Sequence, residues 1–529
     1  MSTPGMGQPP ARVPPQYSHS RRAFVYSIPC AVRPWGGHGS DDTNWRQLPM
    51  RPRLRLLSED LIEKIVQEAC KLLETKGVTL NHVELLRILA DLKCKVDLDR
   101  RRVWFPRDVI DWALGSAPRQ VKLWDIEGTN HCDLSGDNVH FTPGSAAIKM
   151  LDYDTNRMRP ATTPDMLQYS RLVEQLDHID SASTAVVPSD VPERIGDSIR
   201  LYALLKTTTK PIVTGAFSID GFDVMADLQL VIRGTRQALR EKPFAMFSCC
   251  PTSPLKWSDV TADNTMKCAR LGIPVEFIAM PLCGLVAPIS LVGCVIQHTA
   301  ETLSGIVISQ ASCPGAPIVY GGSPGVFDMR TMAATICSVE AQMIDCAYVE
   351  VGKHLGLPTQ AYIGMSDSKF LDGQAGFESG TGTYLAALAG INSVSGPGML
   401  YFESCQSLEK LVFDAQICAM ARRLVAGMEV RKDFPADALF EELIRQENLL
   451  TAEHTLKYFR HEHHIPGPVI DRTQVQDPAT DYPDLRQRSH AEVERHLSSY
   501  QPPQVLSDDQ RRDLEDVMKT AAGGFQVDF

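Results

Sequence analysis

Five charged side chains follow two short apolar stretches of the chain, at residues 317–321 and 361–364. They are Asp328, Arg330, Asp367, Lys369 and Glu378. An arginine guanidinium can hold a carboxylate through two parallel hydrogen bonds, so Arg330 could clamp the acid group of a ligand. A loop ion pair between Arg330 and its neighbour Asp328 would explain the same two residues without a ligand.

Aromatic residues gather at the ends of the apolar stretches. They are Phe217, Phe247, Phe277, Tyr320, Phe327 and Tyr362. The negative faces of such rings attract organic cations, at about 0.5–2 kcal/mol per contact. Together with a carboxylate clamp at Arg330, an aromatic cage describes a betaine, which is a quaternary ammonium with an acid group. The alternative is that these rings fill the core between strands and helices.

The apolar stretches alternate with amphipathic segments of helical length. We predict strands at 184–187, 212–217, 244–248, 275–280, 317–321, 361–364 and 391–395. We predict helices at 195–206, 221–233, 262–271, 293–310, 332–355 and 379–388. This alternation is typical of a parallel sheet built from β-α-β units. Polar, Gly-rich loops follow nearly every strand, which favours a (β/α)8 TIM-type barrel with an eighth strand still to be located over an open doubly wound sheet.

Changes in composition divide the chain into four parts. We expect a disordered tail at 1–50, an N-terminal α+β cap at 51–160, the barrel at 161–430 and a C-terminal helical extension at 431–529. Ser58 carries a helix-start signal at the head of the cap. Thr163, Pro164 and Asp165 carry another, with a capping residue, a proline and an acid in succession.

Bulk composition excludes several classes of protein. The chain has 529 residues, 43% hydrophobic and 22% charged, and its net charge of −11 argues against nucleic-acid binding. Its 14 cysteines show no disulfide spacing, which indicates reduced thiols and a cytoplasmic protein. Residues 277–296 lack charge, but their prolines and glycines favour a strand, a loop and a helix start over a membrane span. The acid-poor residues 1–40 fit a disordered tail better than an organelle transit peptide.

Common cofactor and nucleophile motifs are missing. The chain has no GxxxxGK[ST] or GxGxxG loop, so we expect no bound nucleotide, and no HExxH or CxxC, so we expect no metal. Residues 321–325 match GxSxG formally. The residue after Ser323 is Pro324, however, which has no N–H for an oxyanion hole.

Five motifs between Gly144 and Val430 resemble the trimethylamine methyltransferase family. They are TTTKPIVTGAFS at 207–218, GGSPGVFDMRT at 321–331, IGMSDSK at 363–369, FESGTGT at 377–383 and GINSVSGPGMLYFESCQSLEKLVFD at 390–414. The resemblance implies a β/α barrel that moves a methyl group from a methylamine to a corrinoid (cobalamin) carried by a partner protein. Trimethylamine-using members contain pyrrolysine, whereas only ordinary residues follow FDMRT here. The chain therefore resembles the non-pyrrolysine branch, which implies a quaternary amine such as glycine betaine.

The resemblance also suggests roles for the singled-out residues. We expect Phe217, Phe247, Phe277 and Tyr320 to form a cation cage beside Phe327. We expect Arg330 to bind the carboxylate and Asp328 to orient it. The residues expected to line the mouth are Ser366, Asp367 and Glu378. With Asp328, Arg330 and Glu378 as the catalytic set, no metal or nucleophile is needed, because a quaternary ammonium already activates its methyl group.

Two other functions remain open at this level, as does the assembly state. A zinc-dependent methyltransferase could use Cys249, Cys250 or Cys283 with His298, and metal analysis would test it. A non-catalytic betaine-binding barrel protein would bind the cation without turnover. For the corrinoid-dependent methyltransferase we expect a small quaternary amine substrate, no membrane association and a homo-oligomer, whereas zinc-bound thiolates would suit thiol or alcohol substrates.

Overall fold

The computed structural model describes residues 51–525, apart from 432, 434–435 and 476–479. The tail predicted for 1–50 lies outside these residues. The described chain begins with helices and a small sheet of β12, β1, β3 and β2, in that order. Its elements are α1 (Glu59–Thr75), β1 (Val78–Leu80), α2 (Val83–Asp91), β2 (Lys95–Asp97), β3 (Arg102–Trp104), α3 (Arg107–Ser116) and β12 (Lys256–Trp257). Ser58 caps α1 as predicted, because its hydroxyl accepts the N–H of Leu61.

Eight short strands pair in parallel in two sheets. One sheet has the order β15-β13-β11-β10-β9 and the other β18-β19-β6. The strands are β6 (His140–Thr142), β9 (Ala182–Ser183), β10 (Ile212–Thr214), β11 (Ala245–Cys249), β13 (Val275–Ala279), β15 (Ile318–Gly322), β18 (Gln360–Tyr362) and β19 (Ser393–Ser395). The parallel α/β architecture is therefore confirmed. The strand that the sequence did not locate is β6, which lies within the range predicted for the cap.

Hydrogen bonds join the two sheets at both ends. A parallel bridge links Tyr320 of β15 to Thr359, the residue before β18. The carbonyl of Phe141 in β6 accepts the N–H of Asp180 at 2.8 Å, just before β9. Each edge of the five-stranded sheet is thus bonded to an edge of the three-stranded sheet.

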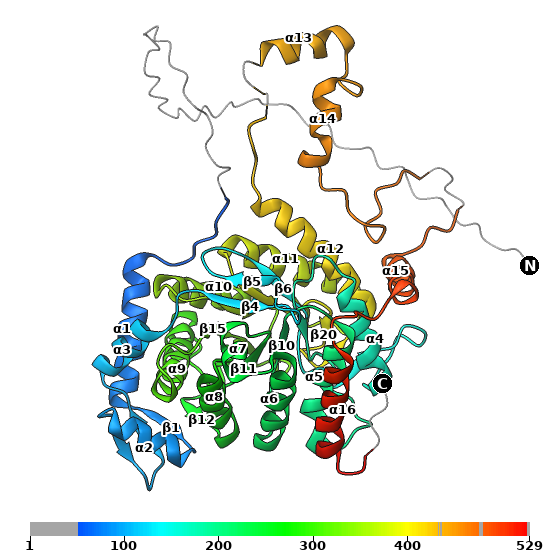
Figure 1. The fold of residues 1–529 in the computed structure, drawn as a ribbon. Coiled ribbons are helices and arrows are strands. Elements are labelled where there is room, and N and C mark those ends of the chain that lie inside the picture. Colours follow the sequence, from blue (N-terminus) through cyan, green and yellow to red (C-terminus); the bar gives the residue numbers. More distant parts are fainter. Residues whose placement is uncertain (1–50, 432, 434–435, 476–479, 526–529) are drawn as a thin grey trace, which may run out of the picture. The chain divides into compact units, whose positions relative to one another are not determined.

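Helices alternate with the parallel strands along the chain. They are α4 (Thr163–Glu174), α5 (Gly196–Thr207), α6 (Ile219–Arg233), α7 (Arg236–Glu241), α8 (Asp259–Leu271), α9 (Leu291–Ser312), α10 (Val339–His354) and α11 (Gly373–Ala389). Figure 1 shows α6, α8 and α9 side by side in front of the strands. The antiparallel hairpin of β4 (Val121–Trp124) and β5 (His131–Leu134) contributes Leu123 and Leu134 to a cluster with Val213, Met246 and Val319 of the parallel strands.

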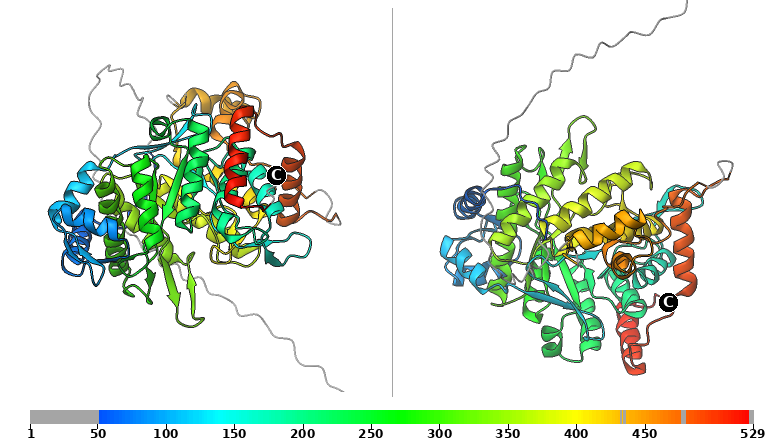
Figure 2. Two further views of the ribbon diagram at one scale, coloured as in Figure 1. Left: turned by 60° about the horizontal axis from the view of Figure 1, so that its bottom comes forward. Right: turned by 90° about the horizontal axis from the view of Figure 1, so that it is seen from above.

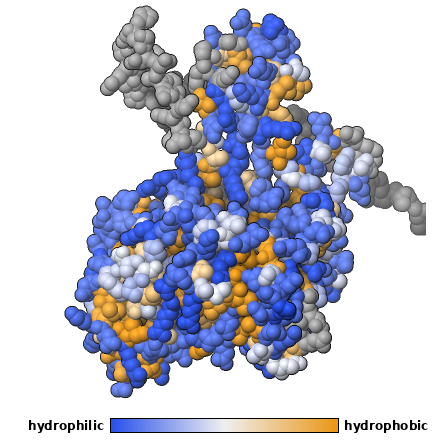
Figure 3. Space-filling model, in the orientation of Figure 1, coloured by the Kyte–Doolittle hydropathy of each residue, from blue (hydrophilic) through white to orange (hydrophobic). Residues whose placement is uncertain are grey.

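Helix α9 is long and apolar enough to cross a membrane, but most of it is buried inside the protein. It packs against α1, α3, α8 and α10. The uncharged residues 277–296 form the end of β13, the short strand β14 (Leu282–Cys283) and the start of α9, as predicted. Figure 3 shows a largely hydrophilic face with separate apolar areas.

One predicted helix, at 332–355, was placed too early. Residues Ala333–Thr335 form β17, which pairs antiparallel with β16 (Gly325–Asp328), so α10 begins only at Val339. The pairing gains ladder hydrogen bonds that an isolated helical turn would not have. Figure 2 shows this hairpin, in yellow-green, projecting from the neighbouring elements in both views.

The remaining elements comprise two small hairpins and the C-terminal helices. The strands are β7 (Lys149–Leu151), β8 (Met158–Pro160), β20 (Met399–Leu400) and β21 (Cys405–Gln406), which form one sheet. The helices are α12 (Leu408–Val425), α13 (Asp437–Gln446), α14 (Glu453–Glu462), α15 (Leu485–Ser499) and α16 (Asp508–Ala522), and the short 3-10 helix is η1 (Glu193–Ile195).

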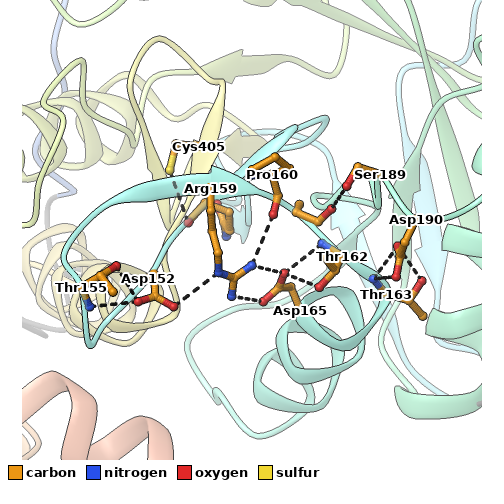
Figure 4. A network of polar contacts seen from close by, with 12 residues as sticks. Asp152, Thr155, Arg159, Pro160, Thr162, Thr163, Asp165, Ser189, Asp190 and Cys405 are labelled. Atoms are coloured by element: carbon orange, nitrogen blue, oxygen red, sulfur yellow. Dashed lines mark hydrogen bonds and ion pairs between the residues drawn. The ribbon is translucent and has the colours of Figure 1, made fainter.

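A dense polar network fixes the start of α4 (Figure 4). Thr162 and Asp165 form a reciprocal capping box, so the helix starts where the sequence predicted but its cap is Thr162, one residue before the predicted Thr163. Arg159 of β8 donates two hydrogen bonds to Asp165, of 2.6 and 2.7 Å. The arginine lowers the pKa of the Asp165 carboxyl despite its burial. The network therefore ties β8 to the helix that follows it.

Replacing Asp165 with Ala should lower the free energy of unfolding by about 2 kcal/mol, because the cap and the Arg159 pair are lost together. Urea-induced unfolding would measure the loss. Asp509→Ala removes an exposed carboxylate that pairs with Arg512 on α16, and it should change the free energy of unfolding by less than about 0.5 kcal/mol. Equal effects of the two substitutions would contradict a stabilising role for the network.

Candidate active site at the carboxyl ends of the parallel strands

A cleft of about 610 Å³ lies beside the β16–β17 hairpin. It brings together the charged residues that the sequence singled out, namely Asp328, Arg330, Asp367, Lys369 and Glu378. Phe402, from the turn between β20 and β21, also lines the cleft. Residues from three separate loops thus converge at one place, as expected when parallel strands deliver their following loops to one edge.

Arg330 and Asp328 form a two-point ion pair within the hairpin. The Arg330 Nε and Nη2 atoms donate to the two carboxylate oxygens of Asp328, at 3.0 and 2.7 Å. These bonds hold the pKa of Asp328 down at about 2. The Arg330 side chain is 88% exposed. The loop ion pair foreseen from the sequence is therefore present, on a guanidinium that solvent can reach.

Glu378, Ser366 and Asp367 hold loops together at the floor of the cleft. Glu378 Oε2 accepts the Ser366 hydroxyl at 2.6 Å and the backbone N–H of Asp367 at 2.9 Å. Asp367 in turn accepts the Thr335 hydroxyl at 2.5 Å and the backbone N–H of Cys337 at 3.1 Å. Burial raises the pKa of Asp367. These carboxyl groups thus position the loops that follow β17 and β18.

Three of the four rings assigned to a cation cage face the helices instead. Phe277 lies edge-on to Trp257 and fills the space beside Gly305 of α9, where a Cβ would meet the ring at 2.7 Å. The Tyr320 hydroxyl donates to Thr299 of α9 at 3.0 Å. Phe247 packs on Phe222 of α6 with centroids 5.1 Å apart. The prediction of a cage from Phe247, Phe277 and Tyr320 is therefore wrong, because all three rings fill the layer between strands and helices.

The two other predicted rings, Phe217 and Phe327, are not in the layer between strands and helices. Phe217 is 62% exposed before α6, and its ring lies 4.9 Å from the guanidinium of Arg200. Phe327 is half-buried on β16, next to Asp328. The structure therefore does not bring the predicted rings together around one ligand.

The opposite side of the same strands carries a buried carboxyl group that the sequence analysis missed. Successive strand residues alternate sides, so Glu276 points away from the helices that its neighbour Phe277 contacts. Ser248 is in register with Glu276 on the neighbouring strand, and its hydroxyl donates to Glu276 Oε1 at 2.6 Å. Glu276 is 0% exposed, and burial raises its pKa to about 7. The signal in the sequence that could have identified Glu276 is a glutamate inside the otherwise apolar segment VEFIA.

A second buried carboxyl group, Glu403, comes from the turn between β20 and β21. Tyr401, Phe402 and Glu403 have φ values of 50°, 54° and 62°, a left-handed conformation that non-glycine residues rarely adopt in succession. Glu403 Oε1 accepts the Ser323 hydroxyl at 2.9 Å. Burial raises the pKa of Glu403 to about 7, and the residue as a whole is half-buried.

Tyr362 and Cys250 lie near both carboxyl groups. Repulsion by ionised Glu276 and Glu403 contributes to raising the pKa of each of these two side chains, beyond the effect of burial. The Tyr362 hydroxyl is 2.7 Å from Ser145 Oγ. Cys250 is half-buried, like Ser248. The inner side of the strands is therefore acidic and hydroxyl-rich around Tyr362.

Two of the four residues weighed as zinc ligands, His298 and Cys283, have other polar or stacking partners. His298 stacks on Tyr348 with centroids 3.9 Å apart, and its Nε2 lies 3.0 Å from the carbonyl of Gly321. Cys283 Sγ donates to backbone carbonyls of the following loop. Burial raises the pKa of Cys249 to about 12, which disfavours the thiolate. Among the described residues, no group of three His, Cys, Asp or Glu side chains has metal-binding geometry.

Parallel strands with a polar cleft and buried carboxyl groups at their carboxyl ends are typical of an α/β enzyme. A family model described as trimethylamine methyltransferase matches residues 36–524. The chain therefore belongs to the trimethylamine methyltransferase family and is a methyltransferase.

Relatives cover most of the chain at modest identity. A glycine betaine methyltransferase of Desulfitobacterium hafniense strain Y51 is 28% identical over 454 residues, which are 85% of this chain and 94% of the relative. A trimethylamine methyltransferase of Methanosarcina thermophila is 28% identical over 467 residues, 86% of this chain and 95% of the relative. A crystal structure of the Methanosarcina barkeri monomethylamine methyltransferase aligns with a TM-score of 0.45 at 11% identity, covering 89% of this chain and 95% of that chain.

The stability of the protein should depend on the titration of Glu276. The unfolded side chain loses its proton near pH 4.5 and the folded one near pH 7, so folded stability falls as pH rises between these values. Glu276→Gln cannot titrate, and its free energy of unfolding should fall by about 2–3 kcal/mol less than that of the wild type between pH 5 and pH 7. Urea unfolding at both pH values measures this. An exposed control, Glu63→Gln, should keep the wild-type slope; a wild-type slope in Glu276→Gln would contradict the raised pKa.

Proposed function

We propose that the eight parallel strands close into a (β/α)8 barrel. Hydrogen bonds that connect both edges of the five-stranded sheet to the three-stranded sheet support this closure. The cluster of Val213, Met246 and Val319 under the β4–β5 hairpin fits a filled barrel floor. The charged cleft then lies at the mouth. We retain the predicted domain limits, with the exception that β6 belongs with the barrel strands.

We infer that the protein moves a methyl group from a quaternary amine of the betaine class to the Co(I) of a corrinoid carried by a partner protein. The observation that supports this function best is the match of the methyltransferase family along nearly the whole chain. Relatives named for glycine betaine and for trimethylamine support an amine as the donor. Only ordinary residues follow the FDMRT motif, which favours a quaternary donor.

The proposed reaction requires little acid–base chemistry from the protein. The cobalt electron pair forms a bond to the methyl carbon, the carbon–nitrogen bond breaks, and its electron pair stays on nitrogen as the neutral tertiary amine leaves. The protein binds the cation, removes water from around it and aims one methyl group at the acceptor. Arg330 would meet a carboxylate of the donor at the rim of the cleft, in exchange with its partner Asp328. Ser366, Asp367 and Glu378 would position the surrounding loops, and Phe217 and Phe327 stay candidates for contact with the donor.

The rim of the cleft offers a surface on which a corrinoid protein could dock. Large apolar side chains are exposed on the loops and helix starts that follow the parallel strands. They include Leu285 at 58%, Ile289 at 64%, Met329 at 63%, Met332 at 72% and Phe377 at 73%. Exposed apolar groups in such numbers are typical of protein-binding sites. All 13 cysteines in the described residues are free, which fits the cytoplasmic location that we propose, and a homo-oligomer stays a prediction.

Methyl transfer itself can be measured directly. The purified protein would be mixed with a corrinoid protein in the Co(I) state and with a panel of betaines, tetramethylammonium and trimethylamine, and the cobalt absorbance would be followed. Methylation by a quaternary amine but not by trimethylamine is expected. Tight binding of a betaine without any methylation would instead support a binding protein, and zinc-dependent activity would support the metal alternative.

Arg330→Ala should raise the KM for a betaine about tenfold or more and leave the KM for tetramethylammonium unchanged, because tetramethylammonium has no carboxylate. Arg330→Lys should restore part of the loss, since lysine keeps the charge but not the paired geometry. Arg87→Ala, an exposed arginine on α2, serves as the control. An unchanged KM for the betaine in Arg330→Ala would remove this residue from the site.

A further inference from the structure

Two buried carboxyl groups on the inner side of the parallel strands have no positively charged partner. Among the described residues, the groups that shift the pKa of Glu276 and Glu403 include no lysine, arginine or histidine. Burying ionisable groups without a counter-charge is costly, so such groups are rare unless something compensates. The compensation here does not come from the described part of the chain.

The polar contacts of both groups leave room for a further partner. Glu276 is fully buried, and its Oε2 atom has no hydrogen-bond partner among the described residues. Its other oxygen accepts a single hydroxyl, from Ser248. Glu403 likewise accepts one hydroxyl, from Ser323, and the residue as a whole is half-buried. A neutral hydroxyl does not offset a carboxylate charge.

The surroundings match the needs of an organic cation. The charges of both carboxyl groups raise the pKa of the nearby Tyr362 hydroxyl. The Tyr362 side chain belongs to one apolar cluster with Ile278, Met365 and Met399. Phe402 packs against the same cluster and also lines the mouth cleft. An ammonium with methyl substituents needs both an apolar wall and negative charge, and this combination occurs here.

We propose that Glu276 and Glu403 form the subsite for the ammonium end of the methyl donor, with Tyr362 and Phe402 as its aromatic walls. This proposal rests on the proposed function, and it replaces the aromatic cage with a pair of carboxylates. A donor enters from the cleft with its cation inward, and any carboxylate it carries faces outward to Arg330.

The same arrangement makes the affinity for a betaine depend on the distance between its carboxylate and its ammonium group. Glu276, Glu403 and Asp367 all repel a carboxylate, and Asp367 also raises the pKa of Glu403. In glycine betaine one carbon separates the carboxylate from the ammonium, so binding the cation brings the acid group towards these carboxylates. Donors with a longer spacer, such as γ-butyrobetaine, keep the acid group at the rim. The site therefore favours a long-spaced betaine over a short one.

The test compares cations with uncharged isosteres in binding, without the need for turnover. Titration calorimetry on the full chain would use tetramethylammonium and γ-butyrobetaine, together with 4,4-dimethylpentan-1-ol, an uncharged compound with a tert-butyl group. Glu276→Gln and Glu403→Gln should each weaken cation binding by about tenfold or more and leave binding of the uncharged compound within twofold. Asp125→Asn removes a buried carboxyl group from the loop between β4 and β5, outside the subsite, and should bind the cations like the wild type.

The outcomes separate this subsite from the proposed function. Wild-type cation affinity in both glutamine variants, with melting temperatures showing that they are folded, would overturn the subsite even if methyl transfer occurs. Loss of cation binding in the variants supports the subsite even if the wild type transfers no methyl group. A Kd for glycine betaine, measured in the same calorimetry, that is equal to or below that for γ-butyrobetaine would overturn the ranking by charge spacing. If one glutamine variant fails to fold, the cation affinity of the other, shown to be folded by its melting curve, tests the subsite.

Discussion

The alternation of side chains along the parallel strands decides which residues can meet a ligand. In β13, Phe277 fills the layer against α9 while its neighbour Glu276 points to the other side of the strand. If the register of β13 shifted by one residue, Phe277 would face the inner side and Glu276 would face the helices. Side chains alternate in the same way along the other parallel strands, so that one set faces the helices and the next set faces the inner core. The chemistry of the site therefore depends on the parity of single positions.

This parity explains why the fold was easier to predict than the site. Alternating apolar strands and helices indicated parallel pairing. Local signals at Ser58 and at Thr163 to Asp165 marked helix starts that the structure has, although the second helix is capped by Thr162. In a segment such as VEFIA all residues are buried, so the sequence does not indicate which side of the sheet each side chain faces. The cage from Phe247, Phe277 and Tyr320 was wrong for this reason. Arg330 and Asp328, close in sequence and on one loop, were correctly placed together.

The sequence also does not indicate which residues distant in the chain come together at the site. Glu403 enters the site from a hairpin that is distant in the chain from β13, and its turn contains three successive residues in the left-handed region. No local propensity predicts that conformation for Tyr401, Phe402 and Glu403. The strand β6 was missed for a related reason. Its three residues gain their strand character from pairing with β19, not from their own apolar pattern.

The turn that holds Glu403 depends on support from α12. Asp414 accepts the backbone N–H of Gly398, at the base of the hairpin, and pairs with the fully buried Lys410 at 2.5 Å. Lys410 also donates to Ser379 of α11. A buried ion pair stabilises a protein little in net terms, but it fixes geometry, because a lone buried charge is so unfavourable. The left-handed turn costs free energy that only its surroundings can offset. The Lys410–Asp414 pair therefore anchors the hairpin in the orientation that carries a carboxylate to the inner side of the strands.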